Sequence, residues 1–313
     1  MRAKQSESDI AHHSQPLKFA AIDIGSNAVR LLLANVFEDR KNVLFKKDAL
    51  VRMPLRLGAE VFRNGRLSEA KAEALVNTMV GFRYLMDSQK PLAHKACATS
   101  AMREAANGRE VIARIQERAG IAVQIIGGQQ EAELLYENHI AEKLNNKAVF
   151  LYIDVGGGST EITLFSENRR VTSSSFNVGT VRLLEKLVVT AEWERMRDWV
   201  KTITVGFNEM GAIGTGGNIN KLFELSHLRE GKPLPLKKLR EINNFLKSIK
   251  INDRITVLGL KPDRADVIIP AAEIYLSIMK WAKINKVYVP QVGLADGIIH
   301  TLYEQHRQQS TPQ

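Results

Sequence analysis

Apolar and polar positions alternate along the chain in blocks that predict strands and tight turns. In residues 19–36 (FAAIDIGSNAVRLLLANV), two β-rich apolar runs flank a short turn of glycine and serine. Residues 149–165 (VFLYIDVGGGSTEITLF) have the same order of apolar run, aspartate, small-residue turn and apolar run. A strand, a tight turn and a second strand form a β-hairpin, so we expect one in each block.

The two blocks align residue by residue. Asp23 corresponds to Asp154 and Gly25 to Gly156, an offset of about 131 residues that is close to the size of a domain. A repeat at this distance predicts two related domains that face each other across a cleft. The alternative is a pair of unrelated hairpins that share common turn residues.

Helical periodicity and capping residues predict the elements around the hairpins. Ser68 has the chemistry of an N-cap, and Gly120 that of a helix end. Helices are expected at 68–88, from Thr99-Ser100 to Asn107-Gly108, and at 109–119, 129–140, 191–209, 237–247, 264–284 and 294–303, with strands at 94–99, 121–126, 210–213 and 286–289. Helices and strands mixed throughout the chain predict an α/β protein.

A length of 313 residues suggests two domains at about 150 residues each. We expect residues 1–18 to be a polar tail, 19–141 to form the first domain with a C-terminal helix at 294–304, and 147–293 to form the second. The polar stretch before residue 147 is the predicted boundary. The long apolar helix at 264–284 could be core or interface, and core is the preferred interpretation.

Composition excludes several classes of protein. Hydrophobic residues make up 44% and charged residues 25%, which is typical of a globular protein rather than a disordered one. No apolar run approaches the roughly 18–20 residues of a membrane span, and the N-terminus lacks the apolar centre of a secretory signal. The single cysteine, Cys97, excludes an internal disulfide framework and a Cys-rich zinc site, and agrees with a cytoplasmic location.

The chain carries 44 basic and 34 acidic residues, a formal net charge of +10 that points to an anionic partner. The basic residues are scattered, and the aromatic residues, 6% of the chain, do not alternate with them as in a base-stacking surface. Nucleic acid is therefore a minor candidate. A diffuse field that attracts a small or chain-like polyanion remains open.

Three turns rich in glycine follow apolar strands, and such turns can bind phosphate oxygens through backbone N–H groups. The third leads into a helix, whose N-terminus also favours anions. They contain Gly25, Ser26 and Asn27; Gly156, Gly157, Gly158, Ser159 and Thr160; and Gly214, Thr215, Gly216 and Gly217. Neither GxxxxGK[ST] nor GxGxxG occurs there, so P-loop and Rossmann nucleotide binding are disfavoured.

Acidic residues flank the second turn. A hairpin brings Asp154 and Glu161 beside it, and hard oxygen ligands near phosphate suit Mg²⁺. Glu161 could instead be an exposed strand residue, and Asp23 could hold metal-linked water or cap its own turn. Glu131 lies in the first turn of a predicted helix, where the dipole favours any acid, so a capping role is preferred on the residue alone. Arg103 could hold a phosphate or pair with a surface acid.

Several motifs together resemble the exopolyphosphatase/guanosine pentaphosphate phosphohydrolase (Ppx/GppA) family of the actin-like and sugar-kinase superfamily. They are AAIDIGSNAVRLLL, ATSAMREAANG, IIGGQQEAELLY, YIDVGGGSTEITL, GAIGTGGNINKL and RADVIIPAAEIYL, in family order between residue 19 and about residue 300. The resemblance implies an α/β fold of two ribonuclease-H-like domains with the active site between them. Longer members carry a further helical domain, so a short two-domain form is expected here.

The resemblance also implies roles for individual residues. Glu131 matches the catalytic glutamate that acts on the attacking water, Asp154 and Glu161 match carboxylates associated with Mg²⁺, and Arg103 matches a phosphate-contacting arginine. The small-residue turns match phosphate-binding loops. The implied reaction is release of the terminal phosphate of polyphosphate or guanosine pentaphosphate, with a monovalent cation as a further candidate cofactor and a homodimer as a candidate assembly.

Two positions depart from the family pattern. Ala28 stands where a polar residue often follows the asparagine, and Ala295, in PQVGLADGII, stands where an arginine is usual. Two alternative functions therefore stay open: a sugar or small-acid kinase of the same superfamily, and a non-catalytic sensor of guanosine tetra/pentaphosphate or polyphosphate. No clear loop for the acceptor-activating aspartate of a kinase is present in the sequence.

Overall fold

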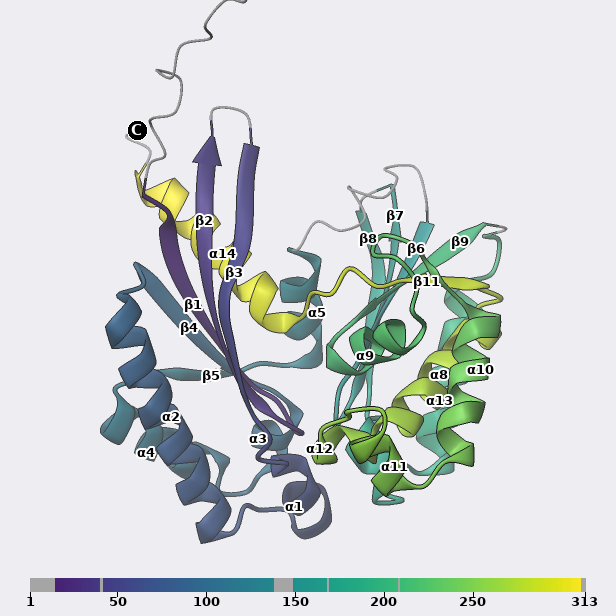
Figure 1. Ribbon diagram of the computed structural model, residues 1–313, viewed down its shortest axis with the longest axis horizontal. Helices are drawn as coiled ribbons and strands as arrows, with labels where there is room; N and C mark the ends of the chain where they lie inside the picture. Colours follow the sequence, from purple (N-terminus) through teal and green to yellow (C-terminus); the bar gives the residue numbers. More distant parts are fainter. Residues whose placement is uncertain (1–14, 40–41, 138–148, 168, 208, 311–313) are drawn as a thin grey trace, which may run out of the picture.

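The computed structural model describes residues 15–39, 42–137, 149–167, 169–207 and 209–310, and contains two α/β domains side by side (Figure 1). The first domain is built on a five-stranded sheet in the order β3-β2-β1-β4-β5. Its strands are β1 (Leu17–Ile24), β2 (Val29–Asp39), β3 (Asn42–Met53), β4 (Ala93–Ala98) and β5 (Val123–Ile125).

The second domain is built on a six-stranded sheet in the order β10-β11-β9-β6-β7-β8. Its strands are β6 (Val149–Val155), β7 (Thr160–Ser166), β8 (Arg169–Phe176), β9 (Met210–Thr215), β10 (Leu234–Pro235) and β11 (Lys286–Tyr288). Without the two-residue strand β10, both sheets have one design: three antiparallel strands, then two strands added in parallel. The predicted fold class, an α/β protein of two domains with one strand arrangement, is confirmed.

The two predicted hairpins are present and equivalent. Asp23 lies opposite Arg30 on β2, and Asp154 lies opposite Glu161 on β7, at the same place in each hairpin. Each sheet also has an irregularity in the pairing with the third strand, between Leu33 and Ala34 in one and at the corresponding position in the other. The shared strand order and register support related domains rather than two unrelated hairpins.

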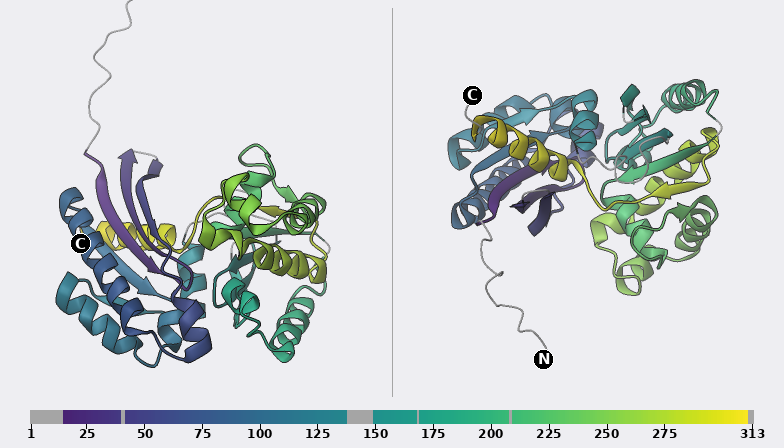
Figure 2. Two further views of the ribbon diagram at one scale, coloured as in Figure 1. Left: turned by 60° about the horizontal axis from the view of Figure 1, so that its bottom comes forward. Right: turned by 90° about the horizontal axis from the view of Figure 1, so that it is seen from above.

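Helices cover both faces of the first sheet (Figures 1 and 2). Helices α2 and α4 pack together over the core that includes Leu75, Met79 and Ile115, whereas α14 packs on β1, β2 and β4 over the other face. The helices of this domain are α1 (Leu57–Asn64), α2 (Glu69–Gln89), α3 (Ser100–Glu104), α4 (Gly108–Ala119), α5 (Gly128–Tyr136) and α14 (Leu294–Ser310).

In the second domain the apolar helix α13 lies inside the core, which confirms the core interpretation of this segment. Tyr275 on α13 is fully buried, and its hydroxyl donates to the backbone oxygens of Ile153 and Thr215. The helices are α7 (Thr180–Leu184), α8 (Thr190–Ile203), α9 (Gly217–Leu225), α10 (Leu236–Ser248), α11 (Ile251–Thr256), α12 (Pro262–Ala265) and α13 (Ile268–Trp281). None of the helices in the described ranges is long and apolar enough to cross a membrane.

The capping predictions hold: Ser68 accepts from the Lys71 backbone N–H, and Gly120 ends α4 with a positive φ. Several predicted helices differ from those observed. The helix predicted at 191–209 ends at Ile203, and the helix predicted at 294–303 continues to Ser310. The segment 264–284 is divided into α12 and α13, and the helix that begins at Ser100 ends at Glu104. Asn107 does not end that helix: its side-chain amide bonds the backbone of Leu67 in both directions, and α4 begins directly after it.

The domain boundaries stay a proposal. Helix α14 contacts the first sheet, in keeping with a first domain of 19–141 completed by 294–304 and a second domain of 147–293. The predicted junction at 142–147, and the end of the helix predicted at 129–140, lie outside the described residues.

Candidate active site

A cleft with a cavity of about 280 Å³ lies between the two domains, and all three small-residue turns contribute to its walls. The first turn comes from the β1–β2 hairpin, the second from the β6–β7 hairpin, and the third connects β9 to α9. The residues of these turns that line the cleft are Gly25, Ser26, Asn27, Ala28, Gly156, Gly157, Ser159, Gly216 and Gly217.

Glycine is required where the two hairpin turns meet. A Cβ on Gly157 would lie 3.0 Å from the Cβ of Ser26 and 3.3 Å from the backbone nitrogen of Asn27. A side chain at Gly157 would therefore push the domains apart at the centre of the cleft. Gly216 has φ +91°, a left-handed conformation that favours glycine.

Four turn residues predicted to bind phosphate are not among those that line the cleft: Gly158, Thr160, Gly214 and Thr215. Thr160 donates to the backbone oxygen of Val178, and Thr215 donates to Asp154. Gly214 adjoins Tyr275, Ile219 and Val287 in the core. The two threonine side chains thus hydrogen-bond within the protein and brace the turns.

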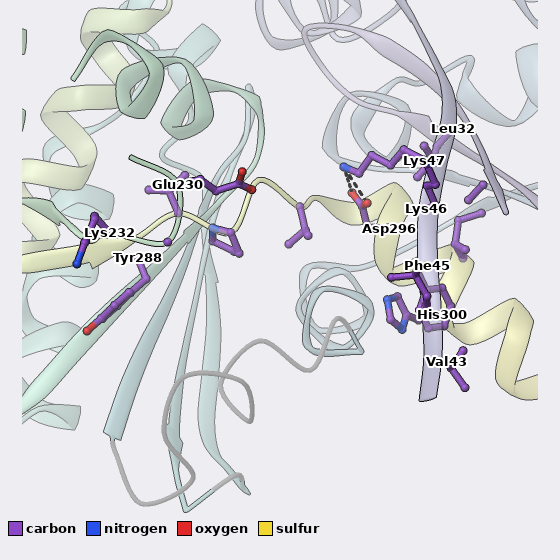
Figure 3. Close-up of a pocket in the computed structure, with 17 residues that line it drawn as sticks. Leu32, Val43, Phe45, Lys46, Lys47, Glu230, Lys232, Tyr288, Asp296 and His300 are labelled. Carbon is purple, nitrogen blue, oxygen red and sulfur yellow. Dashed lines mark hydrogen bonds and ion pairs between the residues drawn. The ribbon is translucent and has the colours of Figure 1, made fainter. Parts of the chain in front are cut away.

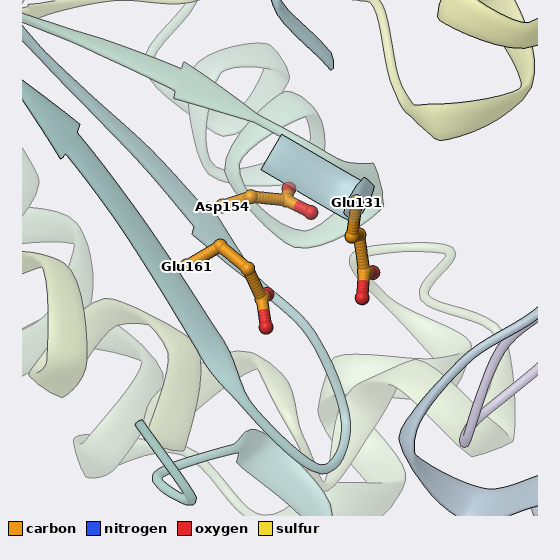
Figure 4. A group of neighbouring side chains, drawn as sticks. All are labelled: Glu131, Asp154 and Glu161. Carbon is orange, nitrogen blue, oxygen red and sulfur yellow. The ribbon is translucent and has the colours of Figure 1, made fainter. Parts of the chain in front are cut away.

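Glu131, Asp154 and Glu161 converge beside the cleft (Figure 4). Each offers one carboxylate oxygen, and the three oxygens lie within 4.8 Å of one another. Glu131 comes from the first turn of α5 in the first domain, Asp154 from the end of β6 and Glu161 from the start of β7. The cluster therefore exists only because the domains meet. We call these three residues the carboxylate cluster.

Burial makes the carboxylate cluster costly to charge. It raises the pKa of Asp154 to about 6 and that of Glu161 to about 7. The pKa of Glu131 is raised well above its usual value, first by burial and then by the negative charges of Glu161 and Asp154. Three acids so close repel one another once ionised, and a cation among them would relieve both effects.

The cluster has the chemistry of a cation site. Glu131 Oε2 and Glu161 Oε2 are buried and accept no hydrogen bond from the described residues. Carboxylate oxygens of this kind are the ligands that Mg²⁺ and other hard divalent cations prefer. The residues present thus fit a metal ion, and the metal-binding role of Asp154 and Glu161 stays a prediction.

Hydroxyl groups orient the two carboxylates of the second hairpin. Thr215 Oγ1 donates to Asp154 Oδ1 at 2.9 Å, and Ser175 Oγ on β8 donates to Glu161 Oε1 at 2.8 Å. A Cβ on Gly128 would overlap Ser175, so glycine at the start of α5 lets Glu131 approach the second domain. Sequence reasoning did not single out Ser175, whose alignment with Glu161 depends on the pairing of β7 with β8.

Arg103 lies near the carboxylate cluster but is not among the residues that line the cleft. Its Nη1 donates to the backbone oxygen of Ile126 at 2.8 Å, which holds the guanidinium group close to the N-terminus of α5. The positive charge of Arg103 lowers the pKa of Glu131, whereas burial and the neighbouring carboxylates raise it.

Four cations that sequence reasoning did not select line the cleft: Arg30, Arg52, Arg264 and Lys47. Arg30 pairs with Asp23 at 2.7 Å, which gives that aspartate a partner other than a metal. Arg264 is crowded: burial, Arg52 and Arg30 lower its pKa to about 10. The position of Arg30, directly after the first turn, was the available signal in the sequence.

The other two cations of this group, Arg52 and Lys47, are held at the cleft by contacts with residues distant in sequence. Arg52 forms an ion pair with Asp263 of the second domain, and Lys47 pairs with Asp296 at 2.9 Å. Ala28 and Ala295, the two departures from the family pattern, are buried residues that also line the cleft. Although position 295 has no arginine, the first hairpin and β3 still bring Arg30, Arg52 and Lys47 to the cleft.

Comparison with known proteins gives a consistent result. The profile of the Ppx/GppA phosphatase family matches residues 40–306. A bifunctional 3-dehydroquinate synthase/phosphatase from Fusobacterium nucleatum is 30% identical over 286 residues, which span 84% of this chain and 43% of that protein. Exopolyphosphatase 1 from Mycobacterium leprae is 24% identical over 309 residues, or 90% of this chain and 88% of that protein.

A solved structure shows the same arrangement. The Aquifex aeolicus member of the Ppx/GppA family superposes with a TM-score of 0.74 at 25% identity, covering 93% of this chain and 99% of that one. The chain thus spans most of the Mycobacterium leprae protein and of the Aquifex aeolicus structure, but less than half of the Fusobacterium protein.

Proposed function

Since the chain belongs to the Ppx/GppA phosphatase family, we propose that it releases the terminal phosphate of inorganic polyphosphate or guanosine pentaphosphate with Mg²⁺ in the cytoplasm. The observation that carries this proposal is the buried carboxylate cluster beside the small-residue turns in a cleft lined by arginines. Hydrolysis of a phosphoanhydride needs a positioned water, charge neutralisation and a fixed phosphate, and the cleft offers groups for each.

Asp154 and Glu161 are proposed to hold Mg²⁺, with Thr215 and Ser175 fixing their orientation. The bound ion supplies positive charge that neutralises the charge developing on the phosphate oxygens. A monovalent cation is a second candidate for binding by the same carboxylate oxygens. The raised pKa values of both carboxyls mean that a cation must compete with protons for this site near neutral pH.

Glu131 is proposed to orient the attacking water and accept its proton. Of the two glutamates in the carboxylate cluster, Glu131 lines the cleft and Glu161 does not. Glu131 is therefore the glutamate that can reach a water beside a bound phosphate. Arg103 is proposed to position Glu131 through its charge and to contact phosphate only if its bond to Ile126 is exchanged.

The substrate phosphates are proposed to lie on the hairpin turns. The turn residues proposed to contact them are Gly25, Ser26, Asn27, Gly156, Gly157, Ser159, Gly216 and Gly217, with Gly158, Thr160, Gly214 and Thr215 supporting them. Arg30 and Arg264 add positive charge to the cleft beside Gly217 of the third turn, and planar guanidinium groups suit phosphate oxygens.

One assay tests the proposal. Phosphate release is measured against Mg²⁺ concentration for polyphosphates of several lengths and for guanosine pentaphosphate, with Glu131→Ala as the blank. We expect Mg²⁺-dependent release in the wild type and none above the blank in the variant. ATP consumption that requires a sugar would instead indicate a kinase, and tight ligand binding without phosphate release would indicate a sensor.

A further inference from the structure

Three consecutive glycines, residues 156–158, begin the second small-residue turn, and the start of α7 holds each of their carbonyl groups. The N–H of Thr180 donates to the first carbonyl oxygen at 3.0 Å, and the N–H of Val181 donates to the second at 2.8 Å. The Nε of Arg182 donates to the third, that of Gly158, at 2.7 Å. Three successive residues of α7 thus fix three successive peptide groups of the turn.

These bonds orient the N–H groups of the turn. All described peptide bonds are trans, so each N–H points opposite to the carbonyl that precedes it. The N–H groups of Gly157, Gly158 and Ser159 therefore point away from α7. Gly157 and Ser159 line the cleft, and no acceptor in the described ranges bonds the N–H of Gly157 or Gly158. Free N–H groups in such a turn suit phosphate oxygens.

The glycine run needs these contacts, because its backbone is otherwise free to adopt many conformations. A turn that is held before its ligand arrives avoids the cost of ordering on binding. Close packing adds to the fixation: a Cβ on Gly179 would lie 2.4 Å from the backbone oxygen of Gly157. A Cβ on Gly158 would lie 2.4 Å from Cζ of Phe62. The turn is therefore held between α7 of its own domain and α1 of the first domain.

Arg182 connects the turn to the first domain. Its side chain is buried, and its Nη2 forms an ion pair with Glu104 at the end of α3. Its guanidinium carbon lies 3.9 Å from the centroid of the Phe62 ring on α1. Arg182 lines neither the cleft nor the neighbouring cavity between β3, α14 and the β11 region (Figure 3). An effect of Arg182 on a ligand in the cleft must therefore pass through the turn.

We propose that Arg182 is a positioning residue: it holds the glycine turn in the conformation that presents N–H groups to substrate phosphate, and it makes that conformation depend on docking of the two domains. The bonds from Thr180 and Val181 stay within the second domain, whereas Arg182 contacts residues of both domains. The inference rests on the proposed function and deepens it, because it adds a residue that acts on phosphate binding without touching the substrate.

Binding of tripolyphosphate to Arg182→Gln and Glu104→Gln tests the proposal. A chelator is present, so that Mg²⁺-dependent hydrolysis does not interfere. We expect the Kd of Arg182→Gln to rise roughly 10–100-fold, because a misplacement of about 1 Å at a positioned group can cost a factor of about 100. Glu104→Gln should give a smaller rise, because the bond to Gly158 remains.

The matched control is Arg63→Gln. Arg63 on α1 pairs with Glu185, which directly follows α7, so this variant removes an ion pair between the same two helices without touching the turn. It should keep the wild-type Kd. Circular dichroism at the assay temperature checks that each variant is folded. If Arg182→Gln does not fold, Glu104→Gln at the more exposed end of the same contact decides the question.

The metal requirement separates positioning of the turn from a general loss of domain docking. In Arg182→Gln the Mg²⁺ concentration for half-maximal activity should change less than the Kd for tripolyphosphate, because Thr215 and Ser175 orient Asp154 and Glu161. A general loss of docking would change both alike, since Glu131 comes from the first domain. Equal changes of both quantities would therefore contradict the proposal.

The two proposals fail in different ways. Wild-type affinity for tripolyphosphate in the folded variants of Arg182 and Glu104, or equal weakening in Arg63→Gln, would overturn the role of Arg182, and phosphate release by the wild type would still support the proposed function. A wild type that binds tripolyphosphate through Arg182 but releases no phosphate would keep the positioning role and lose the proposed function.

Discussion

The two hairpins have one backbone design and opposite chemistry. Across the first sheet, the residues aligned at the level of the turn are Cys97 on β4, Asp23 on β1, Arg30 on β2 and Arg52 on β3. We call this the cationic row. It holds one carboxylate and two guanidinium groups, and Arg30 neutralises Asp23 directly.

The corresponding row of the second sheet is Thr215 on β9, Asp154 on β6, Glu161 on β7 and Ser175 on β8. We call this the acidic row. It holds two carboxylates, each with a hydroxyl donor, and no cation. Where the first row has an arginine opposite its aspartate, the second has a glutamate.

The contrast teaches how a repeated fold acquires an asymmetric site. At the same register position, arginine forms an ion pair with the aspartate of the first hairpin, whereas glutamate gives the second hairpin a pair of carboxylates. Asp23, Arg30 and Arg52 of the cationic row and Asp154 of the acidic row line one cleft, so charges of both signs meet there. Helix α5 then adds Glu131 to the acidic row only.

The largest effect is expected from Glu131, which ties α5 to the acidic row. Glu131→Gln should lower kcat by about 10²–10⁴-fold, the usual contribution of a general base, with little change in substrate affinity. Steady-state kinetics and binding measurements check this. Glu133→Gln, on the exposed side of the same helix, is the matched control and should keep the wild-type kcat. Near-native turnover of Glu131→Gln would contradict the assignment.

Arg30→Gln should separate the two rows. Charge-assisted hydrogen bonds contribute about 1.5–3 kcal/mol, so we expect KM for the phosphorylated substrate to rise roughly 10–100-fold. The Mg²⁺ concentration for half-maximal activity should change by a smaller factor than KM, because Arg30 acts on Asp154 only through its charge, the smallest of the influences on the pKa of that carboxyl. Arg83→Gln, a surface arginine paired with Asp87 on α2, serves as control. A metal requirement that changes more than KM in Arg30→Gln would show that the rows do not act separately.

Thr215→Val removes the hydroxyl that orients Asp154. Groups that orient metal ligands typically contribute 10–100-fold in metal affinity or activity, so the half-maximal Mg²⁺ concentration should rise by about that factor. Cys97→Ala changes the equivalent position of the cationic row and should leave the metal requirement as it is. Equal metal responses of the two variants would remove the distinction between the rows.

The smallest effect is expected on stability as a function of pH. Burial raises the pKa of Glu161 from 4.5 to about 7 and that of Asp154 from 3.8 to about 6. The folded protein thus binds protons more tightly than the unfolded chain, and the resulting stability is fully present below the unfolded values and lost as pH rises through the folded ones. Without metal, Tm should fall between about pH 5 and pH 8 by a few degrees.

Adding Mg²⁺ at the upper end of this range should restore Tm, because the ion replaces the protons on the acidic row. Glu161→Gln should flatten the pH dependence, while Glu133→Gln should retain it. Thermal unfolding with and without a chelator measures both. A Tm that rises with pH in the absence of metal would contradict the assigned pKa directions.

Local residue patterns predicted most of the fold. Alternating apolar residues around a small-residue turn predicted both hairpins, and the offset between Asp23 and Asp154 predicted the paired domains, since these signals act over a few residues. Predictions were wrong where a contact with a residue distant in sequence determines the local structure. Asn107 has the chemistry of a helix end, but its bonds to Leu67, 40 residues away, place it before α4 instead.

The candidate site likewise contains residues that local patterns could place and residues that only long-range contacts place. Asp154 and Glu161 could be placed together from the sequence, because a hairpin fixes their separation. Glu131 has the pattern of an ordinary helix cap, and the resemblance to a family, rather than local physics, gave it a role. Arg52, Arg264 and Ser175 were not selected, because their positions depend on sheet register and on packing between domains.

The sequence by itself determined the two hairpins, their turns and the carboxylates beside the second turn, because short-range backbone sterics and apolar alternation specify such units. Only the tertiary structure decided that α5 brings Glu131 to the acidic row and that arginines gather on the cationic row. Long-range contacts alone bring those groups together, and the burial they impose raises the pKa of the carboxyls.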